Sequence, residues 1–136
     1  MKSTLAIAAL SMLLAQPVLA QSAGQELPAD LLKAIKGQID QCRYAGGNPL
    51  PHPGFVTTGD INGDGRTDYL TDSARFECQG YPGYFCQQGG CDVALYLTGP
   101  EGLKRAWQGK GTQPRFEGNS FSYRDPSGAT KRLNMR

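Results

Sequence analysis

The chain is poor in histidine and lacks the sequence motifs of common catalytic sites. Only one of its 136 residues is a histidine and only one is a tryptophan. No Gly-x-Ser-x-Gly elbow, His-Glu-x-x-His pair or phosphate-binding loop occurs in it. The one histidine, His52, lies between two prolines and has no partner at motif spacing. The sequence therefore predicts no catalytic residue, and we expect a protein that is not an enzyme.

A strong excess of one charge is also lacking. Fourteen basic and twelve acidic residues give a net charge of +2, which predicts no nucleic-acid partner. The charges are nevertheless segregated, with acids gathered in 60–77 and bases in 102–136. The basic segment is interpreted either as a contact for an anionic membrane or cell-wall polymer, or as the solvated face of a small β-domain. Its bases are Lys104, Arg105, Lys110, Arg115, Arg124, Lys131, Arg132 and Arg136.

Long hydrophobic runs are absent apart from one near the N-terminus. Lys2, the apolar run from Leu5 to Leu14 and the small residues before Gln21 are typical of a secretory signal peptide over 1–20. The run is too short to span a bilayer, so a retained anchor is the less favoured alternative. We expect an exported, periplasmic or secreted monomer whose residues 21–136 form one domain without a transmembrane segment.

Four cysteines in an exported chain predict two disulfides rather than free thiols. Three pairings are possible. The turn Gly89-Gly90 favours a local bridge from Cys86 to Cys91, which leaves Cys42 to pair with Cys78. A zinc site is the competing interpretation, but the paired Cys-x-x-Cys spacing is missing.

The remaining pattern predicts one helix followed by short strands. Leu31, Leu32, Ile35 and Ile39 recur at helical spacing and predict a helix from Ala29 to about Gln41. Residues 46–54 hold three prolines and three glycines and predict irregular structure. Strands are predicted at 55–58, 69–72, 74–78, 92–98, 103–108, 121–123 and 130–135. We expect an α+β fold in which an N-terminal amphipathic helix packs on a small antiparallel β-meander.

The most informative segment is the acidic, glycine-containing stretch 60–68. Hard cations such as Ca²⁺ take six to eight oxygen ligands, and short acidic loops that curl at glycines supply them. The alternative is an Asn-Gly and Asp-Gly hairpin turn with incidental acids. The predicted ligands are the side chains of Asp60, Asn62, Asp64 and Asp68 and the backbone carbonyl of Arg66.

This stretch differs from an EF-hand, whose twelfth position is a bidentate Glu, because Thr71 stands there. Residues 59–70 instead resemble the calcium loop of FG-GAP and VCBS-type repeats, which bridges two strands. The resemblance covers about a dozen residues and implies calcium at the five positions just named. It does not extend to a propeller, which needs several blades. Without a bidentate Glu we expect weak binding, around 10⁻⁴–10⁻³ M, and calcium acting as a structural clip.

Two classes of function follow. The first is a calcium-stabilised binding module whose partner is a protein or an envelope polymer, with an inhibitor or immunity protein as one variant. Its candidate contact residues are Tyr81, Tyr84 and Phe85, which could equally cover the core. The second is a hydrolase of cell-wall polymers, in which Asp72 and Glu77 would form the carboxylate pair.

Overall fold

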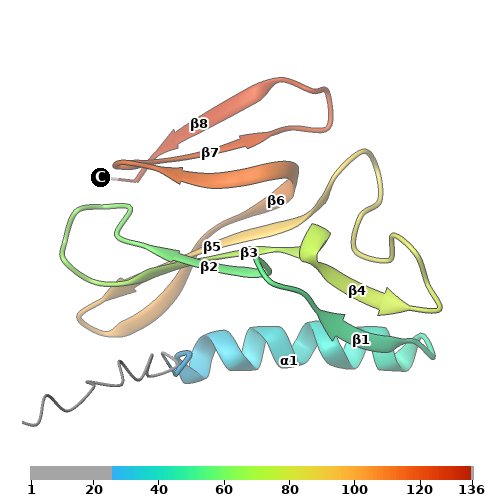
Figure 1. Cartoon of the computed structure of the whole chain (residues 1–136). Helices are drawn as coiled ribbons and strands as arrows, with labels where there is room; N and C mark the ends of the chain where they lie inside the picture. The colour runs from blue at the N-terminus through green and yellow to red at the C-terminus, as the bar shows by residue number, and fades with distance from the viewer. Residues whose placement is uncertain (1–25, 136) are drawn as a thin grey trace, which may run out of the picture.

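The computed structural model describes residues 26–135, and the predicted signal peptide lies outside this range. One α-helix is followed by eight strands and one 3₁₀ turn (Figure 1). In chain order these are α1 (Ala29–Tyr44), β1 (Asn48–Pro51), β2 (Val56–Gly59), β3 (Asp68–Asp72), η1 (Ser73–Arg75), β4 (Phe76–Gln79), β5 (Cys91–Gly99), β6 (Gly102–Glu117), β7 (Ser120–Arg124) and β8 (Thr130–Asn134).

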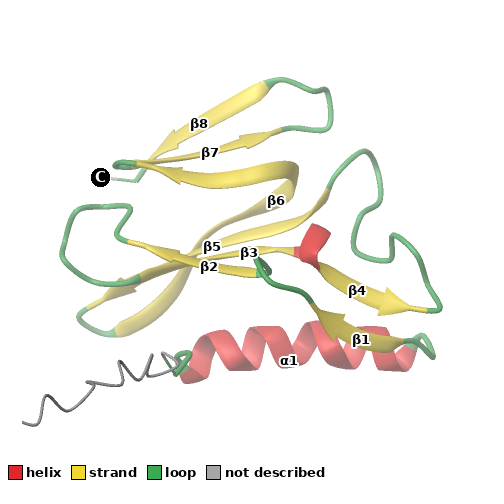
Figure 2. Cartoon of the chain, in the orientation of Figure 1, coloured by secondary structure: helices red, strands yellow, loops and turns green. Residues whose placement is uncertain are grey.

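The strands form two antiparallel sheets. Six of them pair in the order β2-β3-β5-β6-β7-β8, and β1 pairs with β4 in a separate two-stranded sheet. Every pairing is antiparallel, as predicted. Figure 2 shows α1 running below the sheets, with β1 next to its C-terminal half. The coarse prediction of one helix with antiparallel strands is confirmed, and the larger sheet is a meander from which only β4 is diverted.

Helix α1 ends at Tyr44, three residues later than the sequence predicts. Leu31 and Cys42 are fully buried, while Ile35 and Ile39 pack against the first of two hydrophobic clusters. That cluster consists of Cys42, Phe55, Phe76, Cys78 and Phe85. No helix within residues 26–135 is long and apolar enough to cross a membrane.

The second hydrophobic cluster lies on one face of the six-stranded sheet. Its fully or nearly fully buried members come from the acidic loop and from β3, β5 and β7: Ile61, Leu70, Val93, Leu95 and Phe121. Trp107 and Tyr123 pack against them, with ring centroids 4.7 Å apart. The acidic loop is therefore attached to the main core through Ile61.

Strand β1 corrects the prediction that residues 46–54 are irregular. Pro49 faces Cys78 and Pro51 faces Phe76 in the register with β4. Because the two prolines are separated by one residue, both fall at positions of the same kind in the ladder. His52 donates its backbone N–H to the Arg75 carbonyl at 2.7 Å, which places the prolines at the non-hydrogen-bonded positions. Proline has no backbone N–H, and the ladder requires no donor at these positions, so the two prolines do not weaken the pairing.

Strand β6 is also much longer than the predicted segment 103–108. Its extension contains Gly109 and Gly111, which sequence reasoning treats as strand breakers. A Cβ on Gly109 would lie 2.6 Å from the Trp107 ring, and one on Gly111 would lie 2.7 Å from the Tyr123 ring. The glycines are thus required by aromatic rings that lie across the strand, and they do not end it.

Candidate functional site

The acidic loop connects β2 and β3, as the sequence predicts. Gly59 faces Asp68 in the register of these two strands, so residues 60–67 close a hairpin. Gly63 and Gly65 adopt φ values of 73° and 79°, in the left-handed region that favours glycine. The backbone therefore curls back on itself at the two predicted glycines.

Asp60 is the centre of this curl. Its Oδ1 accepts hydrogen bonds from the backbone N–H groups of Gly63 at 2.9 Å and Asp64 at 3.1 Å. Its Oδ2 accepts from the N–H of Gly65 at 2.8 Å. Three consecutive N–H groups thus converge on one exposed carboxylate. They offset part of its negative charge and fix the path of the loop.

Asn62 and Asp64 also face the loop backbone. The Asn62 Oδ1 accepts the N–H of Asp64 at 3.2 Å, and the Asp64 Oδ1 accepts the N–H of Arg66 at 2.9 Å. The Asn62 amide donates to the second oxygen of Asp64 at 3.4 Å. A carboxylate offers about four lone-pair sites, so these bonds leave acceptor capacity on Asp60 and Asp64.

Asp68 lies apart from these three residues because it is fully buried. Its Oδ2 accepts the N–H of Ile61 at 2.9 Å, and its Oδ1 accepts the N–H of Thr98 on β5 at the same distance. The carboxylate thus joins the start of the loop to the neighbouring strand. In this arrangement Asp68 is a structural support, and its role as a cation ligand stays a prediction.

The loop offers oxygen donors of the kind that a hard cation takes, but it does not form a cage around one point. Among residues 26–135, no three His, Cys, Asp or Glu side chains gather as a metal-binding group. Oxygen ligands at this site would come from Asp60, Asp64, the Asn62 amide and the Arg66 carbonyl, with water completing the shell. That set suits a weak calcium site and lacks the ligands of a tight one.

A cavity of about 570 Å³ opens beside the loop. Asn62 and Asp64 form one wall, and the β5–β6 turn around Pro100 forms the other. Glu101 and Lys104, 3.2 Å apart, stand at its edge. The sequence predicts a turn at 99–102, but nothing in its local pattern indicates that this turn meets a loop more than thirty residues earlier.

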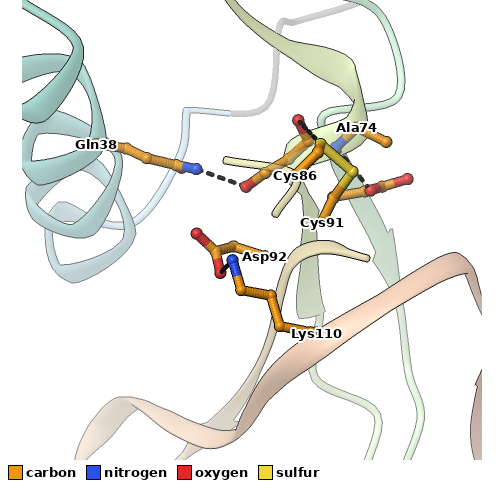
Figure 3. Close-up of a disulfide and its surroundings, with 8 residues drawn as sticks. Gln38, Ala74, Cys86, Cys91, Asp92 and Lys110 are labelled. Carbon is orange, nitrogen blue, oxygen red and sulfur yellow. Dashed lines mark hydrogen bonds and ion pairs between the residues drawn. A yellow bond between two sulfur atoms is a disulfide. The ribbon is translucent and has the colours of Figure 1, made fainter. Parts of the chain in front are cut away.

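The two disulfides pair as predicted, Cys42 with Cys78 and Cys86 with Cys91. The second closes the last part of the loop between β4 and β5, and Figure 3 shows it next to the Ala74 turn. Within that loop Tyr81 is 42% exposed, Tyr84 is half-buried and Phe85 is 4% exposed. Phe85 therefore belongs to the core, which matches the alternative interpretation for this residue, while Tyr81 remains accessible.

Asp72 and Glu77 have separate structural partners. Asp72 caps η1 by accepting the N–H of Ala74 at 3.0 Å, and burial raises the pKa of its carboxyl despite this bond and the nearby charge of Arg75. Glu77 lies 3.0 Å from the Nε2 of His52, beside a cavity of about 280 Å³. Asp72 does not line that cavity.

Most bases of the basic segment lie next to acids. Glu117 contacts both Arg115 and Arg132, Glu101 contacts Lys104, Lys110 contacts Asp92 and Lys131 contacts Asp125. Although desolvation opposes it, hydrogen bonding from Ser122 together with the two arginines holds the pKa of Glu117 below its usual value. This pairing favours the interpretation of a solvated face over that of an anion-binding surface.

Comparisons of this chain with protein-family models, with curated proteins and with solved structures found no match.

Proposed function

We propose that this protein is an exported binding module whose acidic loop holds Ca²⁺ as a structural clip. The observation that carries the proposal is the convergence of three backbone N–H groups, from Gly63, Asp64 and Gly65, on the carboxylate of Asp60. This curl keeps the oxygens of Asp60, Asn62 and Asp64 within one short turn. A divalent ion there would relieve the repulsion between the two carboxylates.

The expected binding is weak and selective for calcium. The loop lacks a bidentate Glu, and Mg²⁺ prefers few protein ligands and keeps its waters. The two disulfides support export as part of the proposal, because disulfides form readily only in oxidising compartments. Such compartments expose a protein to calcium at levels that a weak site can use.

The partner-binding surface in this proposal is the disulfide-held loop around Tyr81. Tyr81 and Tyr84 stack edge to face, with centroids 6.4 Å apart, which holds Tyr81 in place while leaving it accessible. A rigid tyrosine gives contact area at low entropic cost. We propose a protein or an envelope polymer as the partner, with an inhibitor or immunity role as one form.

Calorimetric titration of residues 21–136 with CaCl₂ tests the calcium site. We expect saturable heat with a dissociation constant of about 10⁻⁴–10⁻³ M and much less heat with MgCl₂. Asp64→Asn keeps an acceptor for the N–H of Arg66 but removes a charge, so it should weaken binding. Asp40→Asn removes an exposed helix carboxylate that is paired with Lys36 and should leave binding unchanged. Equal heats for all three proteins would refute the site.

The alternative function is hydrolysis of a cell-wall polymer, and the raised pKa of Asp72 is the observation in its favour, since a general acid must stay protonated. Clearing of a peptidoglycan suspension by the protein, abolished in Asp72→Asn and in Glu77→Gln, would support it. No clearing, or clearing that both variants retain, would remove this alternative.

A further inference from the structure

A groove of about 180 Å³ separates α1 from the six-stranded sheet, and its lining combines polar side chains with the apolar residues Phe85, Val93 and Ala94. A helix that covers a sheet usually presents an apolar stripe to it. Here α1 instead presents a small and polar face, whose groove-lining members are Ala34, Gly37, Gln38 and Gln41. Its apolar residues Ile35 and Ile39 pack against the first hydrophobic cluster. The helix side of the groove therefore adds no apolar side chain larger than alanine to it.

The sheet side of the groove is the face opposite the main core. Along β5, Val93 and Leu95 point into the second cluster, so the alternating residues Asp92 and Tyr96 face the helix. Asp92 forms an ion pair with Lys110 at 2.7 Å, and Figure 3 shows this pair across from Gln38. Gln38 itself reaches over to the hydroxyl of Ser73.

A β-bulge places an arginine in this groove. Leu95 faces Trp107 in the register of β5 and β6, but its neighbour Tyr96 faces Arg105, so Ala106 is skipped. Without the bulge the residue opposite Tyr96 would be an alanine. Bulges commonly re-aim a side chain next to a binding site. The result is that Arg105 and Tyr96 line the same groove.

Gly37 leaves space on the helix side. A Cβ at this position would meet nothing within 4 Å, and its φ is not in the left-handed region. Neither crowding nor backbone conformation therefore explains a glycine in mid-helix, which costs about 1 kcal/mol relative to alanine. Its effect is to widen the groove opposite the sheet.

Arg105 lines the groove without an acidic partner among the described residues. Asp92 is matched by Lys110, whereas none of the ion pairs within residues 26–135 includes Arg105. Burial raises the pKa of Tyr96 although the charge of Arg105 opposes it, so the phenol stays a neutral donor. A guanidinium beside a phenol O–H provides the directed donors that a carboxylate accepts.

We propose that the groove between α1 and the sheet binds a small organic carboxylate through Arg105 and Tyr96, with Gly37 making room for it. A water molecule occupies about 30 Å³, so the groove holds the equivalent of roughly six waters. That volume suits a short carboxylic acid rather than a polymer. This site is separate from the acidic loop and does not depend on calcium.

Chemical-shift titration of ¹⁵N-labelled residues 21–136 with sodium acetate and sodium succinate tests this proposal, at constant ionic strength and with a calcium chelator present. We expect saturable shifts confined to Gly37, Gln38, Gln41, Tyr96 and Arg105. Charge-assisted hydrogen bonds contribute about 1.5–3 kcal/mol, so Arg105→Gln should weaken binding by about tenfold or more. Gly37→Leu should abolish binding by filling the groove.

Arg124→Gln is the matched control, because Arg124 is an exposed arginine on β7 and is absent from the residues that line the groove. It should bind like the unaltered protein. The wild-type spectrum serves as the folding reference for each variant, and Arg105→Gln covers the case in which Gly37→Leu does not fold. The absence of saturable shifts in the unaltered protein would overturn the proposal. Equal binding by Arg105→Gln would overturn it too. Because calcium is chelated throughout, neither result bears on the acidic loop.

Discussion

The buried carboxylate of Asp68 accepts a hydrogen bond from the backbone N–H of Ile61 at 2.9 Å, which joins the two ends of the acidic loop. Ile61 is itself fully buried in the main core. The loop tip is therefore exposed, while its base is fixed from beneath by one polar and one apolar anchor. This division separates the residues that shape the loop from those available to a cation.

Replacing Asp68 with alanine should destabilise the fold, even without calcium. The N–H groups of Ile61 and Thr98 would lose their acceptor, and a buried donor left unpaired costs about 1–3 kcal/mol. Urea unfolding in the presence of a chelator should show a loss of roughly 2–3 kcal/mol. Asp40→Ala, which removes an exposed helix pair, should cost well under about 1 kcal/mol. Equal losses in the two variants would contradict the role of Asp68 as a support.

Two glycine-to-alanine substitutions should change stability in opposite directions. Gly37→Ala places its methyl in open space and improves helix propensity, so it should stabilise the protein by about 0.5–1 kcal/mol. Gly109→Ala places its methyl 2.6 Å from the Trp107 ring and should destabilise by about 1–3 kcal/mol. Denaturant unfolding of both variants measures the difference. If Gly109→Ala instead stabilised the protein, the predicted clash between the alanine methyl and the Trp107 ring would be wrong.

The raised pKa of Asp72 makes a prediction about pH. Burial favours the protonated carboxyl in the folded protein, so the stabilisation from this group is complete below the unfolded value of 3.8 and is lost as pH rises through the higher folded value. An asparagine side chain at this position would keep the cap on Ala74 without the charge. Asp72→Asn should therefore be more stable than the unaltered protein at neutral pH, and urea unfolding across a pH series should show the difference vanish in acid. A stability difference between the two proteins that does not change with pH would contradict the raised pKa of Asp72.

The two disulfides should contribute unequally. Cys42 and Cys78 are 36 residues apart in sequence, whereas Cys86 and Cys91 are 5 apart. The chain-entropy relation gives about 4 kcal/mol for the longer loop and about 2 kcal/mol for the shorter one. Thermal unfolding of two double Cys→Ala variants measures the difference. The variant without the Cys42–Cys78 bridge should lose more stability than the variant without the Cys86–Cys91 bridge. The reverse ranking would show that loop entropy is not the dominant effect.

The sequence predicts well those features that depend on local pattern. The spacing of Leu31, Ile35 and Ile39 is sufficient to identify the helix, and Gly89-Gly90 is sufficient to favour the Cys86–Cys91 bridge. Gly63 and Gly65 likewise identify where the acidic loop curls. In each case the cause and the structure lie within a few residues of one another.

Features that depend on distant partners could not be predicted in this way. Pro49 and Pro51 are compatible with a strand only because both fall at the non-bonded positions opposite β4. Gly109 belongs to a strand only because a ring on the same strand lies over it. The pairing of Arg105 with Tyr96 depends on a bulge, and no local pattern marks Ala106 as the residue left out.

Thermal unfolding of residues 21–136 in calcium and in a chelator tests the calcium clip most directly. At a calcium concentration ten times the dissociation constant, binding to the folded state should add about 1.4 kcal/mol of stability. For a domain of this size that raises the midpoint by several degrees. Asp64→Asn should lose most of this increase and Asp40→Asn should retain it. Identical melting curves for the unaltered protein with calcium and with the chelator would contradict the proposed function.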